Sequence, residues 1–349
     1  MTDSAIDARN AGDQATRNEF IQAMRFVAAA LVLVTHATFY YHERIDRAVE
    51  IWRPGGIGVP IFFVISGFVM VVASAKLTRD AAGARVFFAR RLLRIVPLYW
   101  LVTLVKVAIA LAAPAVVHHN HFDLIYAVKS FLFIPAYNAA GEVHPIHGVG
   151  WTLLHEMFFY IVFATVMLFH ASPVRYASLF ILLMYGLGLL VAPSSAFMEV
   201  VTHPINLHFV VGMLLGSAAL RDRLQAPAPL ALLIALVALA LGKLFVPAVM
   251  AWVPFDSAVL LLGCAMMLLA SWKPPRLFNV PVALGDSSYA LYLFHPLIAP
   301  PALMLNNEPR NQRALPSFFL THVAVPTDAM AILPGPVCFV LPALASYTS

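Results

Sequence analysis

Long apolar segments, separated by short polar connections, repeat along almost the whole chain. A bilayer core about 30 Å thick is crossed by a helix of roughly 17–25 mostly apolar residues. A shorter apolar segment, 124–137, contains Pro135 and is better read as a re-entrant or interfacial segment. The pattern therefore predicts an all-α, polytopic membrane protein with about ten transmembrane helices: 20–41, 57–75, 95–117, 151–170, 176–192, 204–220, 228–247, 255–272, 287–305 and 318–343.

Composition supports this class and excludes several others. Apolar residues make up 61% of the 349 residues and charged residues 11%, against about 25% charged in an average soluble domain. A soluble globule of this length could not hide so much apolar surface from water. The two cysteines argue against a disulfide scaffold. The net charge of +5 is interpreted as a record of membrane topology, and no nucleic-acid partner is expected.

The positions of the basic residues predict the orientation of the chain. The connection between the second and third spans is strongly basic, which places it in the cytoplasm by the positive-inside rule. If 124–137 does not cross, the later basic connections fall on the same side, and both termini are cytoplasmic. The expected organisation is a cytoplasmic tail (1–19), a membrane domain of nine spans (20–305) and an atypical, almost uncharged C-terminal segment with a doubtful tenth span (306–349).

Ionisable residues inside spans are costly and therefore suggest function. Arg25 and His36 lie eleven residues apart in the first span, about 16 Å along a helix and on roughly the same face. Glu156 in the fourth span lies at a depth compatible with His36, and a carboxylate that orients an imidazole is a general-base arrangement. The structural alternatives are a snorkelling arginine, a hydrogen-bonded core histidine and a glutamate paired elsewhere.

Two further patterns suggest binding. Arg91 and Arg94 would face the same side of a helix and could clamp a phosphate, although topology alone also explains arginines there. His295 is followed by Pro296, which frees a backbone carbonyl, and a structural role for His295 is the alternative. Glycines around Ser66 in the second span indicate close helix packing rather than a nucleophile. No complete metal-ligand set is visible, and no metal is expected.

Taken together, these segments resemble the acyltransferase family 3 membrane proteins, in particular the branch that acetylates exopolysaccharides. The matching pieces keep the family's order: Arg25 and His36; Ile61–Met70; Arg91 and Arg94 followed by Ile95–Trp100; Ser130–Pro135; Gly150–Tyr160; and Ser288–Pro296. Relatives often carry an acidic residue where this chain has Pro60.

The resemblance implies transfer of an acyl group, commonly from acetyl-CoA, to a carbohydrate hydroxyl. It implies that His36 is the essential histidine and that Arg25 is its paired motif arginine. His36 is expected to act as the base or as a transient acyl carrier, and Glu156 to act with it. The donor is expected at Arg90, Arg91 and Arg94. The expected substrate-binding residues are Trp151, Tyr160 and His295.

The expected partners are acyl-CoA, a carbohydrate acceptor, the lipid bilayer and a polysaccharide export machinery. The expected location is a bacterial-type inner membrane. Two other functions remain open at this point. One is a transporter or flippase for glycans or lipid-linked sugars, which would be marked by inverted repeats. The other is a related acyltransferase that acts on a small molecule.

Overall fold

Helices dominate the part of the chain that this computed structural model describes, which comprises residues 19–112, 123–220 and 279–305. Short 3₁₀ turns precede three of them: η1 (Pro54–Ile57), η3 (Gly148–Gly150) and η4 (Pro204–Asn206). The α-helices are α2 (Glu19–Arg44), α3 (Gly58–Ser74), α4 (Ala81–Ala112), α5 (Leu124–Phe131), α6 (Trp151–Leu168), α7 (Pro173–Leu190), α8 (Ala196–Thr202), α9 (Leu207–Ala219), α12 (Asn279–Gly285) and α13 (Ser288–Leu305).

Six helical segments within these ranges are long and apolar enough to cross a membrane, which confirms a polytopic membrane protein. They are Ile21–Arg44, Pro54–Ser74, Ala81–Ala112, Gly148–Leu168, Pro173–Leu190 and Ala196–Ala219. The predicted ninth span, 287–305, corresponds to α13. The spans predicted at 228–247, 255–272 and 318–343 lie outside the described residues, as does the segment 306–349.

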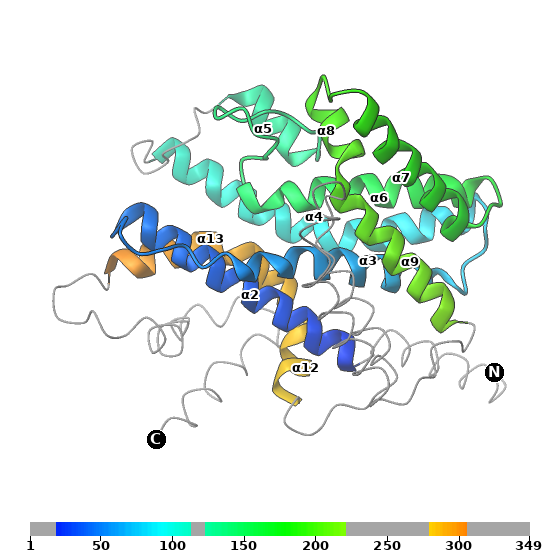
Figure 1. Ribbon diagram of the computed structural model, residues 1–349, viewed down its shortest axis with the longest axis horizontal. Helices are drawn as coiled ribbons and strands as arrows, with labels where there is room; N and C mark the ends of the chain where they lie inside the picture. The colour runs from blue at the N-terminus through cyan, green and yellow to red at the C-terminus, as the bar shows by residue number, and fades with distance from the viewer. Residues whose placement is uncertain (1–18, 113–122, 221–278, 306–349) are drawn as a thin grey trace, which may run out of the picture.

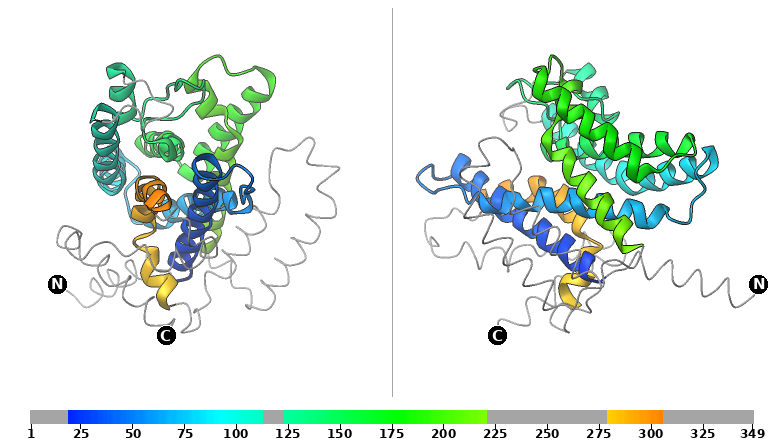
Figure 2. Two further views of the ribbon diagram at one scale, coloured as in Figure 1. Left: turned by 90° about the vertical axis from the view of Figure 1, so that its left-hand side faces the viewer. Right: turned by 45° about the vertical axis from the view of Figure 1, so that its right-hand side comes forward.

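The helices form two groups with α3 between them (Figure 1). In one group, α4, α6, α7, α8 and α9 pack side by side, and in the other α2 packs against α12 and α13. The two further views show the same division, with α13 lying close to both α2 and α4 (Figure 2). This arrangement surrounds the centre of the bundle with α2, α3, α4, α6 and α13.

Small residues let α3 and α9 approach closely, as the glycines of the second span predict. A Cβ atom at Gly67 would collide with the carbonyl oxygen of Phe209, and one at Gly212 would collide with the carbonyl oxygen of Val64. Backbones in contact of this kind are typical of membrane helices, where lipid offers no hydrophobic drive for association and tight packing must supply it.

The third span begins earlier than predicted. Helix α4 starts at Ala81 rather than at residue 95, so most of the basic connection is helical. The Asp80 carboxylate accepts the backbone N–H of Gly83 at 2.8 Å and the hydroxyl of Thr78 at 2.8 Å, which caps this first turn. These two hydrogen bonds hold the pKa of Asp80 below its usual range. The prediction missed this cap because it followed apolar runs alone.

The segment 124–137 forms no helix long enough to cross. Helix α5 contains eight residues, about 12 Å of helix against a bilayer core of about 30 Å. After Phe131 the chain turns at Phe133, whose φ is 55°, and continues without a helix to η3. The predicted sixth span, 204–220, corresponds to η4 and α9, but the apolar helical segment that contains it begins earlier, at Ala196, with α8.

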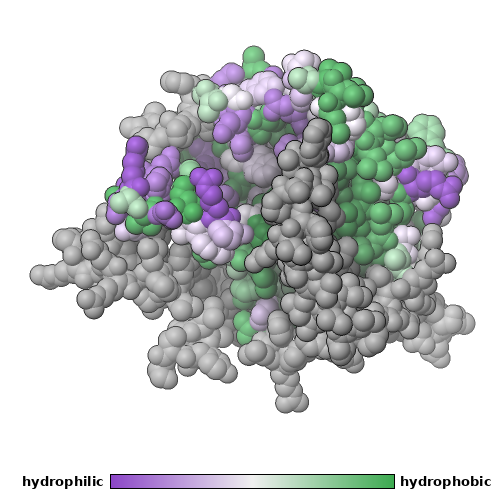
Figure 3. Space-filling view, in the orientation of Figure 1, coloured by the Kyte–Doolittle hydropathy of each residue, from purple (hydrophilic) through white to green (hydrophobic). Residues whose placement is uncertain are grey.

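The outer surface agrees with a membrane environment. Figure 3 shows apolar side chains gathered over α7, with polar side chains around the connections at the edges of the view. The exposed residues of α7 include Leu179, Leu182, Leu183, Leu189 and Leu190. An exposed apolar helix face of this size fits contact with lipid tails rather than with water.

Candidate active site

A charged cavity lies at the centre of the bundle, between α2, α3, α4, α6 and α13. Arg25, Arg91 and Arg94 line it together with Glu156, and these are its charged residues in the described part of the chain. The structure therefore brings together four of the ionisable residues that the sequence singled out. Tyr160 also lines the cavity and is 3% exposed, whereas Arg90 is exposed and does not line it.

Glu156 has a partner that the sequence did not suggest. Its Oε1 atom accepts a hydrogen bond of 2.6 Å from the hydroxyl of Ser66, and this bond links α3 to α6. A short hydrogen bond to an ionised carboxylate is among the stronger polar contacts in proteins. The direct pair expected between Glu156 and His36 is not formed among the described residues, because α13 packs against α2 and supplies the partner of His36 instead.

That partner is His295. The Nδ1 atom of His36 lies 2.8 Å from the Nε2 atom of His295, with ring centroids 4.9 Å apart and planes inclined by 15°. His36 is half-buried and His295 is 3% exposed. The Nδ1 atom of His295 lies 2.7 Å from the carbonyl oxygen of Tyr292. His295 is thus held between its own helix and α2.

Two tyrosines of α13 fix this helix against its neighbours. The hydroxyl of Tyr289 donates to the carbonyl of Ile95 at 2.9 Å, and the hydroxyl of Tyr292 donates to the carbonyl of Val149 at 2.9 Å. Tyr292 also lies 3.1 Å from the hydroxyl of Thr152. Both tyrosines line the charged cavity, so α13 connects the arginines with the histidine pair. Their three-residue spacing, which puts both on one helix face, was the available sequence signal.

Trp151 belongs to a different group. Its ring contacts His155 edge-on, with centroids 5.6 Å apart, and lies 6.3 Å from His144 and 6.4 Å from His203. The Nδ1 atom of His155 bonds the side-chain oxygen of Asn206 at 2.9 Å. Of the residues predicted to bind substrate, Trp151 therefore lies among these histidines, Tyr160 in the charged cavity and His295 beside His36.

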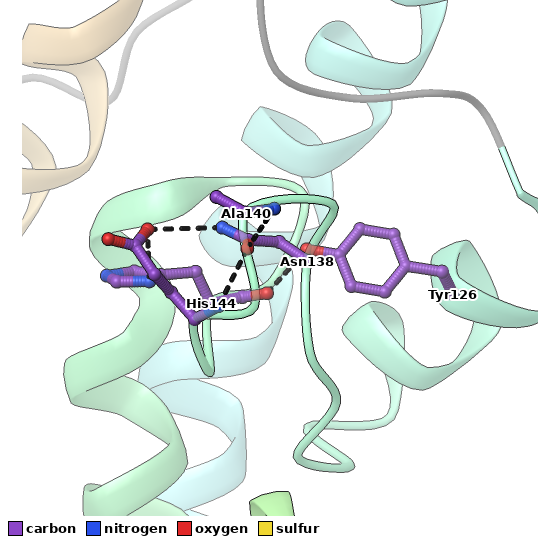
Figure 4. A network of polar contacts seen from close by, with 5 residues as sticks. Tyr126, Asn138, Ala140 and His144 are labelled. Atoms are coloured by element: carbon purple, nitrogen blue, oxygen red, sulfur yellow. Dashed lines mark hydrogen bonds and ion pairs between the residues drawn. The ribbon is translucent and has the colours of Figure 1, made fainter.

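The loop between α5 and η3 is held by a network of polar contacts (Figure 4), and its His144 ring lies against Trp151. The side chain of Asn138 accepts the backbone N–H groups of Ala140 and Glu142, both at 2.9 Å, and closes a tight turn. Tyr126 donates its hydroxyl to the carbonyl of His144, and Glu142 lies 3.4 Å from the His144 ring. Burial lowers the pKa of His144, and the Glu142 carboxylate opposes that shift.

The fold and this site define a polytopic membrane protein that holds a charged cavity and a histidine pair inside its helix bundle. The acyltransferase domain model of acyltransferase family 3 matches residues 18–333, so the chain belongs to this family and is a membrane O-acyltransferase.

Two relatives agree with that assignment. The chain is 38% identical over 252 residues to the exopolysaccharide production protein ExoZ of Rhizobium meliloti (strain 1021), across 69% of this chain and 75% of that protein. It is 26% identical over 185 residues to the peptidoglycan O-acetyltransferase OatA of Listeria monocytogenes serovar 1/2a (strain ATCC BAA-679 / EGD-e), across 49% of this chain and 28% of that protein. No solved structure matches the chain.

Proposed function

We propose that this enzyme moves an acetyl group from acetyl-CoA to a hydroxyl of an exopolysaccharide, or of its lipid-linked precursor, in a bacterial inner membrane. The family supports acyl transfer. The names of the two relatives support the acetyl group and the carbohydrate acceptor, since one refers to exopolysaccharide production and the other to O-acetylation of peptidoglycan.

The arginines of the cavity suit an anionic donor. Three guanidinium groups face one carboxylate there, and guanidinium groups bind phosphate oxygens through two parallel hydrogen bonds. The Nε atom of Arg91 is buried and has no hydrogen-bond partner among the described residues. A buried donor of this kind is costly unless a ligand satisfies it. Arg91 and Arg94 would hold phosphate groups of CoA, with Arg25 further along the path to His36.

His36 suits the role of general base. Its Nδ1 atom is occupied by His295, while its Nε2 atom makes no hydrogen bond within the described residues. In the proposed step, Nε2 accepts the proton of the sugar hydroxyl as that oxygen attacks the thioester carbonyl carbon. The new C–O bond forms, the C–S bond breaks, and the proton passes from His36 to the departing CoA sulfur.

The observation that carries this proposal is the half-buried His36 with one ring nitrogen bonded and the other available, about 16 Å along α2 from an arginine of the charged cavity. An extended acyl-CoA could then lie with its phosphates at the arginines and its thioester towards His36. The two ends of the donor would be recognised by opposite ends of one helix.

The test is O-acetylation of cell-surface polysaccharide in cells that produce His36→Ala. Loss of a general base is expected to reduce acetyl transfer by about 10²–10⁴-fold. His170→Asn is the matched control: His170 is exposed at the end of α6 with a φ of 57°, a conformation that asparagine tolerates. Unchanged acetylation by His36→Ala would refute the mechanism. Absence of acetyl-CoA binding together with glycan movement in vesicles would favour a transporter.

A further inference from the structure

The hydrogen bonds around His295 determine which of its nitrogen atoms carries a proton. Its Nδ1 atom lies 2.7 Å from the carbonyl oxygen of Tyr292. A carbonyl oxygen can only accept, so Nδ1 of His295 must be the N–H donor. His295 is 3% exposed, and its side chain has as partners, among the described residues, the backbone of Tyr292 and Leu291 and another imidazole. A buried ring without a counter-charge is held in its neutral form, which has a single N–H.

Pro296 explains why the Tyr292 carbonyl is available. In a regular α-helix this oxygen would accept the backbone N–H of the residue four positions later. That residue is Pro296, which has no N–H. The adjacent His295 side chain takes the vacant place, so the His-Pro pair acts as a unit within α13.

The same reasoning then applies to His36. Because neutral His295 carries its proton on Nδ1, its Nε2 atom is an acceptor, and Nδ1 of His36 must donate across the 2.8 Å contact. The N–H and the lone pair of an imidazole both lie in the ring plane. Rings inclined by 15° with centroids 4.9 Å apart fit a bond of that kind. Neutral His36 therefore keeps a lone pair on Nε2.

We propose that His295 is a positioning residue, held by the carbonyl that Pro296 leaves free, which fixes His36 as the tautomer whose Nε2 atom can accept a proton. In the other tautomer Nε2 would carry hydrogen and could not act as a base. When Nε2 takes the hydroxyl proton, His36 becomes an imidazolium, and the His295 acceptor stabilises its Nδ1–H. The catalytic meaning of this arrangement rests on the proposed function, but the tautomer itself does not.

Two polar substitutions of His295 separate positioning from packing. In His295→Gln the side-chain oxygen can reach the position of Nε2 and accept from His36. In His295→Asn the shorter amide reaches only the position of Nδ1, so it keeps the contact with Tyr292 but not the contact with His36. We expect His295→Gln to retain activity within about 10-fold. We expect His295→Asn to lose about 10²-fold or more in kcat, as for loss of general-base catalysis, with a smaller change in KM for acetyl-CoA.

The tautomer is measured independently by solid-state NMR of ¹⁵N-histidine-labelled protein in lipid vesicles, where the His36 signals are those missing from His36→Gln. The wild type and His295→Gln are expected to show a protonated Nδ1, and His295→Asn a shift towards a protonated Nε2. Pro296→Ala is expected to move in the same direction as His295→Asn, while Pro97→Ala, inside α4, serves as the control for loss of a helix proline.

An unchanged tautomer in His295→Asn would overturn the proposal, as would equal activity of the two His295 variants in an active enzyme. If the variants show the expected tautomer shifts but the wild-type protein transfers no acetyl group, the proposed function is refuted and the assignment of His295 stays intact. The two failures are therefore distinguishable.

Discussion

Single residues inside this bundle show how few charges a membrane site uses. Glu156 is the one carboxylate among the described residues that line the central cavity, and it faces three arginines. Its bond from Ser66 orients it without neutralising any arginine. The surplus of positive charge is what a phosphate-bearing ligand would compensate.

Arg91→Lys and Arg94→Lys test whether the excess positive charge of the cavity binds phosphate groups. Lysine keeps the charge but loses the planar fork that binds two phosphate oxygens at once. Loss of a hydrogen bond to a charged group is worth about 1.5–3 kcal/mol, so KM for acetyl-CoA is expected to rise about 10- to 100-fold while kcat changes less. Arg85→Lys, exposed on the same helix, is the control. A KM equal to that of wild type in both variants would argue against phosphate binding at this cavity.

At the scale of helices, the contact between α3 and α9 supports the site. Ser66 lies next to Gly67, whose Cα faces the backbone of α9, so the position of the Glu156 partner depends on close packing. Packed interiors transmit small displacements because they contain few voids. A change that separates the two helices should therefore reach the cavity.

Gly212→Ala is the corresponding test. The added methyl group would collide with the backbone of α3, and overpacking of this kind typically costs about 1–3 kcal/mol. We expect a lower unfolding temperature of the detergent-solubilised protein, followed by tryptophan fluorescence. Gly186→Ala is the control in α7, since a Cβ there meets no atom within 4 Å. Equal unfolding temperatures of the two variants would show that the α3–α9 contact tolerates expansion.

At the scale of the whole molecule, the basic residues and the short helix α5 predict which connections face which side of the membrane. The basic residues predict that the connection between α3 and α4 is cytoplasmic. Because α5 is too short to cross, the turn at Ala140 should then lie on the opposite side from Ala82. This topology would place the arginines of α4 near the side where acetyl-CoA is found.

Cysteine labelling tests the topology in a variant with Cys264 and Cys338 replaced by alanine. Ala82 and Ala140 are both exposed and similar in size, so they form a matched pair. In intact spheroplasts a membrane-impermeant maleimide is expected to label Ala140→Cys but to label Ala82→Cys only after permeabilisation. Labelling of both positions from the same side would mean that the segment 124–137 crosses the membrane.

Much of this protein could be predicted from local patterns. The class of fold follows from apolar runs, because a helix in lipid must be apolar over its whole length wherever it lies in the bundle. The same logic selected Arg25 and Glu156, since a charge inside a span is costly enough to need a reason. Arg91 and Arg94 were selected by their three-residue spacing, which places both on one face of a helix. The helical basic segment before residue 95 was missed, because its stability depends on the cap at Asp80 rather than on hydropathy.

The sequence by itself determined that the chain is a membrane protein and which of its residues could carry chemistry. Only the tertiary structure decided the partners: Ser66 for Glu156, and His295 rather than Glu156 for His36. Residues 36 and 295 are 259 positions apart, and no local pattern reports which face of one helix meets which face of another. The His-Pro pair was visible in the sequence, but its effect on His36 follows only from the packing of α13 against α2.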